Sequence, residues 1–136
     1  MDLYAENILD HARRPHGKTL LKNPTAERRE INASCGDDLT VQLQVKNDIV
    51  TKVGWMGAGC AISQAAMSML SDELVGKTIK EVEALKPKAV LELLNVNVGP
   101  RRLKCALLCL HAVKNARRAM EGMKPQSWAE TMNGDQ

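Results

Sequence analysis

The chain has 136 residues, of which 44% are hydrophobic and 26% charged, and its formal net charge is +3; this suits a single domain with one core over residues 1–136. No apolar stretch is long enough to cross a bilayer and the N-terminus lacks an export pattern, so we expect a cytoplasmic protein without membrane contact. With one Tyr, two Trp and no Phe, the chain lacks the stacking platforms of a single-strand nucleic-acid binder, which argues against nucleic acid as a partner.

The first half of the chain is predicted to form one short helix and then a small antiparallel sheet. Apolar and polar residues alternate over residues 39–46, which is the period of a strand that is wet on one face, and Asn47-Asp48 supplies a turn to a returning strand. The predicted elements are a helix at 3–12, a loop at 18–29, and strands at 30–34, 39–46 and 49–56. The apolar face of this sheet must be covered by other elements of the chain.

The second half is predicted to be helical and to supply that cover. Thr78 is placed to cap a helix, with Glu81 at the position that completes a capping box, and Pro87 and Pro100 suit first helical positions. The predicted helices cover residues 60–74, 78 onward, 87–94 and 100–120, and residues 124–136 are predicted to form a weakly ordered tail.

A glycine-rich run lies where the last strand pattern stops and a helix pattern begins. Gly57 and Gly59 allow a tight turn, and the unpaired N–H groups at the helix start are expected to point at the Cys60 sulfur. This arrangement favours a thiolate, the form of cysteine that binds a metal or attacks a sulfane sulfur. The alternative is a small buried cysteine behind a glycine turn.

Three cysteines fall at element boundaries, and a carboxylate accompanies one of them. Cys35 and Asp37 share a tight turn, Cys60 begins a helix, and Cys105 lies early in the longest helix. If these segments meet at one edge of the sheet, they present three sulfurs and one oxygen, a donor set for Zn²⁺, Cu(I) or an iron–sulfur cluster. An oxygen donor holds a soft metal less firmly than a fourth sulfur, which suggests a cargo that is meant to leave.

Other reactive or charged side chains have simpler interpretations. Cys109 follows Cys105 by one turn among leucines and is expected in the core, and His11 and His16 are expected at the surface without a metal role. Lys104 is either solvated or close enough to lower the pKa of a thiolate. Basic residues cluster along the last predicted helix: Arg101, Arg102, Lys104, Lys114, Arg117 and Arg118. They indicate either a solvated face or a face that contacts an acidic protein.

Several short motifs occur together in this chain. They are Tyr4, Asp10-His11 with Pro15, Asn32 with Cys35-Gly36-Asp37, Gly57-x-Gly59-Cys60-Ala61-Ile62-Ser63 with Ser68-Met69, and Arg102-x-Lys104-Cys105. With these motifs, residues 2–120 resemble the U-type iron–sulfur assembly proteins, which include the IscU scaffold, the zinc-containing SufU and the N-terminal domain of NifU. The resemblance implies an α+β fold, with a three-stranded antiparallel sheet packed by helices and a long C-terminal helix.

The resemblance also implies a function. Such proteins receive persulfide sulfur from a cysteine desulfurase, and scaffold members assemble a [2Fe–2S] cluster and pass it to apo-proteins. By resemblance, Cys105 is the persulfide acceptor, and iron, the cluster or Zn²⁺ is held by Cys35, Asp37, Cys60 and Cys105. The chain would then be a scaffold and sulfur acceptor rather than an enzyme that turns over, and whether it forms a homodimer through the Tyr4 segment is left open.

The chain departs from both branches of this family. IscU members carry a His before the last cysteine and an apolar-Pro-Pro-Val-Lys chaperone signal, where this chain has Val98-Gly99-Pro100-Arg101-Arg102-Leu103-Lys104. SufU members carry an inserted segment between the second and third ligand cysteines, for which the spacing from Cys60 to Cys105 leaves no room. The alternatives are therefore a zinc-dependent sulfurtransferase that relays persulfide through Cys105, and a binding module whose cysteines are structural.

Overall fold

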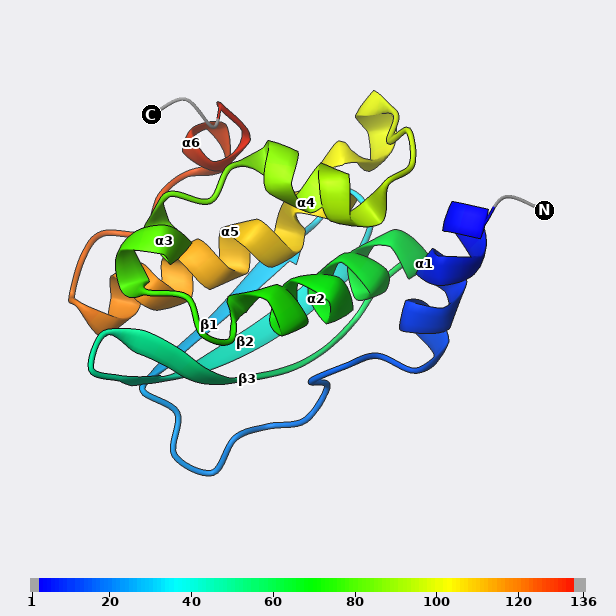
Figure 1. The fold of residues 1–136 in the computed structure, drawn as a ribbon. Coiled ribbons are helices and arrows are strands. Elements are labelled where there is room, and N and C mark those ends of the chain that lie inside the picture. Colours follow the sequence, from blue (N-terminus) through cyan, green and yellow to red (C-terminus); the bar gives the residue numbers. More distant parts are fainter. Residues whose placement is uncertain (1–2, 134–136) are drawn as a thin grey trace.

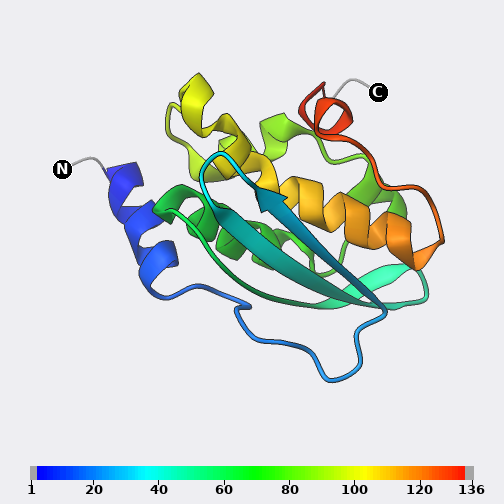
Figure 2. The same cartoon turned by 180° about the vertical axis from the view of Figure 1, so that it is seen from behind.

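Three antiparallel strands form the sheet on which the helices pack, and this computed structural model describes residues 3–133, with side chains from residue 6 onward. The elements are α1 (Leu3–Arg13), β1 (Ala26–Asn32), β2 (Asp37–Lys46), β3 (Ile49–Ala58), α2 (Ala61–Leu74), α3 (Ile79–Glu83), α4 (Pro87–Leu94), the 3-10 turn η1 (Pro100–Arg102), α5 (Leu103–Met120) and α6 (Trp128–Asn133). The strand order is β1-β2-β3; α5 packs on β1 and β2, and α2 packs on β3 and α5 (Figure 1). Seen from behind, the sheet lies in front of these two helices (Figure 2). The predicted α+β fold is confirmed.

The central hairpin follows the predicted alternation. Leu39, Val41 and Leu43 of β2 are fully buried on the face that α5 covers, so the apolar half of the pattern forms the sheet's contribution to the core. Asn47 and Asp48 form the turn with φ values of 53° and 61°, a left-handed conformation that Asn and Asp tolerate. The predicted turn is therefore confirmed.

The first strand begins earlier than the sequence suggested. β1 covers Ala26–Asn32 rather than residues 30–34, and it includes part of the segment predicted to be a loop. Its less exposed positions alternate as expected for an edge strand, but two of them are the charged residues Arg28 and Glu30. Arg28 pairs with Glu30 at 2.9 Å, and Asn115 Nδ2 of α5 donates to Glu30 Oε2 at 2.8 Å. A pattern based on apolar alternation does not detect such a strand.

The helices agree closely with the capping signals. Thr78 is the N-cap of α3, and its side chain and that of Glu81 form the predicted capping box. Proline occupies the first turn of α4 at Pro87 and of η1 at Pro100, where its missing N–H group has no intrahelical partner to lose. These caps set where the helices begin, while the apolar face of each helix sets how it packs.

The C-terminal segment differs from the expected weakly ordered tail over residues 124–136. Trp128–Asn133 forms α6, and its attachment to α5 is polar and aromatic rather than aliphatic. Asn115 Oδ1 accepts the Gln126 N–H at 2.8 Å, and the rings of His111 and Trp128 stack with centroids 4.1 Å apart. A short polar segment carries no apolar periodicity, so its order depends on these buried partners.

Two expectations concern parts of the chain outside this description. The Tyr4 side chain, which was considered for self-association, lies outside the described side chains, and residues 134–136 of the expected tail lie outside the described residues. Among the helices of residues 3–133, none has both the length and the apolar content needed to cross a membrane.

Buried His111 predicts a loss of stability in acid. Burial lowers the pKa of His111 below its usual value of 6.5, although Glu30 opposes this shift. The unfolded chain therefore takes up the proton first as the pH falls, and the contribution of His111 to stability is present above pH 6.5 and lost below it. We expect the free energy of unfolding to fall between about pH 7 and about pH 5, and to fall less steeply in His111→Gln. Urea titrations of both proteins across this range test it; equal slopes would contradict the assignment.

Candidate metal centre

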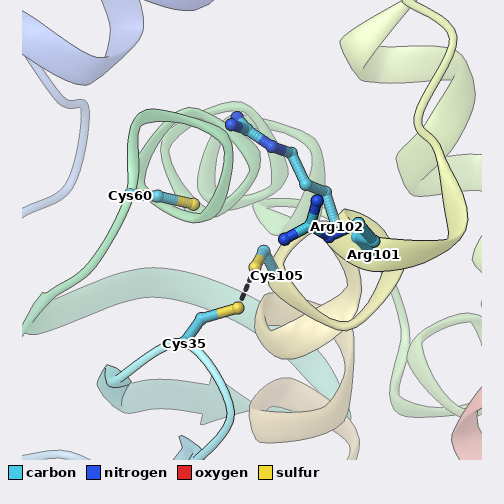
Figure 3. Close-up of a pocket in the computed structure, with 5 residues that line it drawn as sticks. All are labelled: Cys35, Cys60, Arg101, Arg102 and Cys105. Atoms are coloured by element: carbon cyan, nitrogen blue, oxygen red, sulfur yellow. Dashed lines mark hydrogen bonds between the residues drawn. The ribbon is translucent and has the colours of Figure 1, made fainter.

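Three segments that are far apart in sequence meet at one end of the sheet. They are the turn between β1 and β2, the start of α2, and the start of α5 (Figures 1 and 3). Cys35 Sγ, a carboxylate oxygen of Asp37 and Cys105 Sγ all lie within 4.8 Å of one another. The two sulfurs are 3.2 Å apart. The structure therefore brings three of the four predicted donors together.

Cys60, the fourth predicted donor, lies at the same end of the sheet but outside the close group of Cys35, Asp37 and Cys105. It is the N-cap residue of α2 and lines a cavity of about 330 Å³ with Cys35 and Cys105 (Figure 3). Within the described residues, the group of donors that all lie within 4.8 Å of one another contains Cys35, Asp37 and Cys105 without Cys60. Three cysteines therefore line the cavity, and Cys60 lies outside the close group that the other two form with Asp37.

Asp37 joins two of these segments. Its side chain is fully buried, and Oδ1 accepts the Cys60 N–H at 2.9 Å and the Ser63 hydroxyl at 3.3 Å. The Cys60 side chain makes no capping hydrogen bond, so Asp37 caps α2 from another part of the chain. The Cys60 N–H is therefore taken by the Asp37 carboxylate.

The glycines of the cysteine motif make this contact sterically allowed. A Cβ atom at Gly59 would overlap Asp37 Oδ1 and Ser63 Oγ, and one at Gly57 would overlap the Asp38 carbonyl oxygen. In the facing turn, Gly36 has a φ of 73°, and the Cys35 and Gly36 N–H groups both donate to the Asn32 carbonyl oxygen, at 3.2 Å and 3.0 Å. Close approach of other atoms therefore accounts for Gly57 and Gly59, and the left-handed backbone conformation accounts for Gly36.

Cys105 is a buried thiol whose neighbours include a carboxylate and two other cysteines. Burial raises its pKa far above the usual value, and hydrogen bonds with Cys35 and Asp37 and the nearby Cys60 raise it further. Asn32 Nδ2 lies 3.6 Å from the Cys105 sulfur, and the same nitrogen lies 3.4 Å from Asp37 Oδ2. Burial and these neighbours therefore favour the protonated form of Cys105, and a positive charge in the cavity would favour its thiolate.

The remaining predicted residues lie outside this group. Cys109 is fully buried and donates to the Ala106 carbonyl oxygen, and burial raises its pKa to about 12, as expected for a core thiol. The Lys104 ammonium lies 5.6 Å from the centre of the Trp128 ring, so its cation–π partner is on α6. His16 is exposed and pairs with Asp72 of α2 at 2.6 Å.

Two residues that contact the donors had no role assigned from the sequence. Asn32 and Ser63 both donate to Asp37, and Asn32 also approaches Cys105. Ser63 carries a usable signal, because a hydroxyl in the first turn of a helix often takes part in capping. The side chain of Asn32 carries none, since its partners are distant in sequence or depend on the turn geometry.

The fold and the donor set define a class of protein. Three thiols and one carboxylate, without a histidine in the close group, suit a soft cation such as Zn²⁺ or iron in a sulfur-rich centre. All four cysteines are free thiols, so the donors are not consumed in disulfides. This is a small α+β protein with a candidate thiolate metal centre at one end of its sheet.

Comparison with known proteins gives the family. The chain belongs to the NifU-like N terminal domain family, whose model matches residues 3–126. It is 29% identical over 130 residues to the iron-sulfur cluster assembly scaffold protein IscU of Thermotoga maritima, covering 84% of this chain and 92% of that protein. It is 27% identical over 137 residues to the zinc-dependent sulfurtransferase SufU of Bacillus subtilis, covering 88% and 92%.

A solved structure supports the same relationship. A candidate iron-sulfur cluster assembly scaffold protein for the SUF system from Fervidobacterium islandicum AW-1 superposes with a TM-score of 0.70 at 27% identity. The match covers 82% of this chain and 94% of that chain. The family of the chain and its fold, both expected from its motifs, are confirmed.

The contact at Gly59 predicts a large effect from one methyl group. Gly59→Ala should lower the free energy of unfolding by about 2–4 kcal/mol, because the added Cβ displaces Asp37 and leaves a buried carboxylate and N–H group without partners. Urea denaturation of reduced protein measures this. Gly99→Ala is the matched control, since its Cβ would meet no atom within 4 Å, and it should change stability by less than about 0.5 kcal/mol. Equal stability of the two variants would show that Asp37 does not need this space.

Proposed function

We propose that this protein is an iron–sulfur cluster assembly scaffold. It accepts persulfide sulfur from a cysteine desulfurase, builds a [2Fe–2S] cluster on Cys35, Asp37, Cys60 and Cys105, and transfers the cluster to apo-proteins. The observation that carries this proposal is the convergence of Cys35, Asp37 and Cys105 from separate segments within 4.8 Å, beside a cavity that Cys60 also lines. The relatives named as IscU support the same function.

Cys105 is the proposed sulfur acceptor. Its sulfur attacks the terminal sulfur of the desulfurase persulfide; a new S–S bond forms on Cys105, the old one breaks, and the desulfurase cysteine leaves as a thiolate. This transfer involves no net oxidation, whereas conversion of each bound sulfane sulfur to sulfide takes two electrons from an external reductant. Asp37 hydrogen-bonds with the Cys105 thiol and is therefore placed to receive its proton.

Asp37 gives the proposed centre a donor that binds weakly. Oδ1 accepts hydrogen bonds from the Cys60 N–H and the Ser63 hydroxyl, whereas Oδ2 accepts a longer one from Asn32 Nδ2 at 3.4 Å, so Oδ2 is the oxygen better placed to bind a cluster. A carboxylate oxygen that already accepts a hydrogen bond from the protein binds a soft metal less firmly than a thiolate does. This suits a scaffold, which must release what it builds.

A zinc-dependent sulfurtransferase is the second candidate. The observation that favours it is the compactness of the Cys35, Asp37 and Cys105 group, which is of the size that surrounds a single ion. In that case Zn²⁺ would stay in place and Cys105 would only relay persulfide. The metal and acid-labile sulfide content of protein made and handled without oxygen separates the two, because a scaffold yields iron and sulfide and a sulfurtransferase yields zinc alone.

The proposed scaffold acts in the cytoplasm, where thiols remain reduced. Its four free cysteines are compatible with that compartment. We also propose that residues 1–136 work as one domain, with the partner surface around the cysteine cavity. Limited proteolysis of the folded protein should then release no stable folded fragment that lacks α5, and such a fragment would contradict a single domain.

The ligand assignment predicts the outcome of cysteine replacement. Anaerobic reconstitution with iron, cysteine and a desulfurase should give sulfur-to-iron charge-transfer absorption in the wild type. Cys35→Ser, Cys60→Ser and Cys105→Ser should each lose most of it, because a hydroxyl is a poor donor for iron in such clusters. Cys109→Ala should keep the spectrum, since this thiol is buried in the core. Wild-type spectra in all three serine variants would contradict the donor set.

A further inference from the structure

Two arginines share the sulfur-lined cavity. Arg101 and Arg102 form most of η1 and line the same cavity as Cys35, Cys60 and Cys105 (Figure 3). The rigid turn that begins at Pro100 places them directly before α5, and therefore next to Cys105. They are the charged side chains of this cavity lining, and both are positive.

Among the side chains from residue 6 to residue 133, neither Arg101 nor Arg102 is paired with a carboxylate. Near the end of α5, by contrast, Arg117 and Arg118 both pair with Glu83, at 3.7 Å and 3.2 Å. The two positive charges beside the cysteines are thus available to a negative group in the cavity.

The loaded centre would supply that negative group. Three thiolates and one carboxylate carry four negative charges, and either Zn²⁺ or an oxidised [2Fe–2S] core brings two positive charges. The loaded centre is therefore a dianion in both cases. A dianion in a partly buried cavity is unfavourable unless positive groups lie close to it, since Coulomb interactions are weakly screened there.

We propose that Arg101 and Arg102 compensate the charge of the loaded metal centre and thereby set how firmly it holds its cargo. This inference rests on the proposed function, because it requires the donor set to bind a metal or a cluster. The arginines act from outside the coordination shell, as guanidinium groups beside anionic sulfur and oxygen donors. Both lie in the stretch Val98–Lys104, where the sequence departs from the IscU pattern, and Arg102 also belongs to the Arg102-x-Lys104-Cys105 motif.

Cobalt binding tests the inference directly. Co²⁺ is used as the probe, because its absorption reports tetrahedral thiolate coordination, and its affinity is measured by competition with a chelator in anaerobic, reducing buffer. Arg101→Gln and Arg102→Gln should each weaken Co²⁺ binding by about tenfold at low salt, and the double variant by more. The spectrum at saturation should not change, since the arginines are not ligands.

Three comparisons separate charge compensation from a structural role. The loss should shrink at about 1 M salt, where the Debye length is about 3 Å, and the Arg101→Lys/Arg102→Lys variant should recover most of the affinity. The matched control is Arg13→Gln/Arg14→Gln, which removes the same charge from exposed residues of and next to α1 and should bind Co²⁺ like the wild type. A salt-independent loss, or an equal loss in this control, would overturn the inference.

The possible failures are distinguishable. If wild-type protein gave no thiolate spectrum with Co²⁺, the donor set and the proposed function would fail together. If the wild type and Arg101→Gln/Arg102→Gln bound Co²⁺ equally tightly, only the inference would fail. Unchanged Co²⁺ affinity with weaker binding to a desulfurase would assign the arginines to contact with an acidic protein, and would likewise overturn charge compensation.

Discussion

The hydrogen bond between the Asp37 carboxylate and the Cys60 N–H holds the candidate centre together. At 2.9 Å it joins the turn that carries Cys35 to the helix that begins after Cys60. Because Asp37 is fully buried, its charge must be satisfied by such donors, and the geometry of both segments follows from that requirement. Gly59 is needed because a side chain there would occupy the space of this contact, and Gly57 because a Cβ there would overlap the Asp38 carbonyl oxygen.

The same carboxylate couples stability to metal binding. One oxygen caps α2 and the other accepts from Asn32, so Asp37 cannot turn fully toward a cargo without uncapping the helix. Burial keeps the Cys105 pKa high, and its thiolate depends on positive charge in the cavity. In the proposed function the centre is organised by the protein and completed by the charge of its cargo, and in our inference the neighbouring arginines act on the same balance.

Much of the fold could be predicted because it rests on local physical rules. The alternation of Leu39, Val41 and Leu43, the Thr78 capping box and Pro87 at a helix start all depend on residues close in sequence. The strand β1 and the helix α6 were misjudged because their buried side chains are polar. Glu30 and Gln126 find their partner in Asn115 of α5, far along the chain, and no local pattern reports that meeting.

For the site, the sequence by itself determined which atoms could serve as donors, because Cys35, Asp37, Cys60 and Cys105 are chemically suited to a soft metal wherever they lie. Only the tertiary structure decided how these atoms are arranged. It groups Cys35, Asp37 and Cys105, sets Cys60 apart, directs Lys104 to Trp128 and brings two arginines to the cavity. The reason is that distances between such residues follow from how α2 and α5 pack on the sheet, and packing is a property of the whole chain.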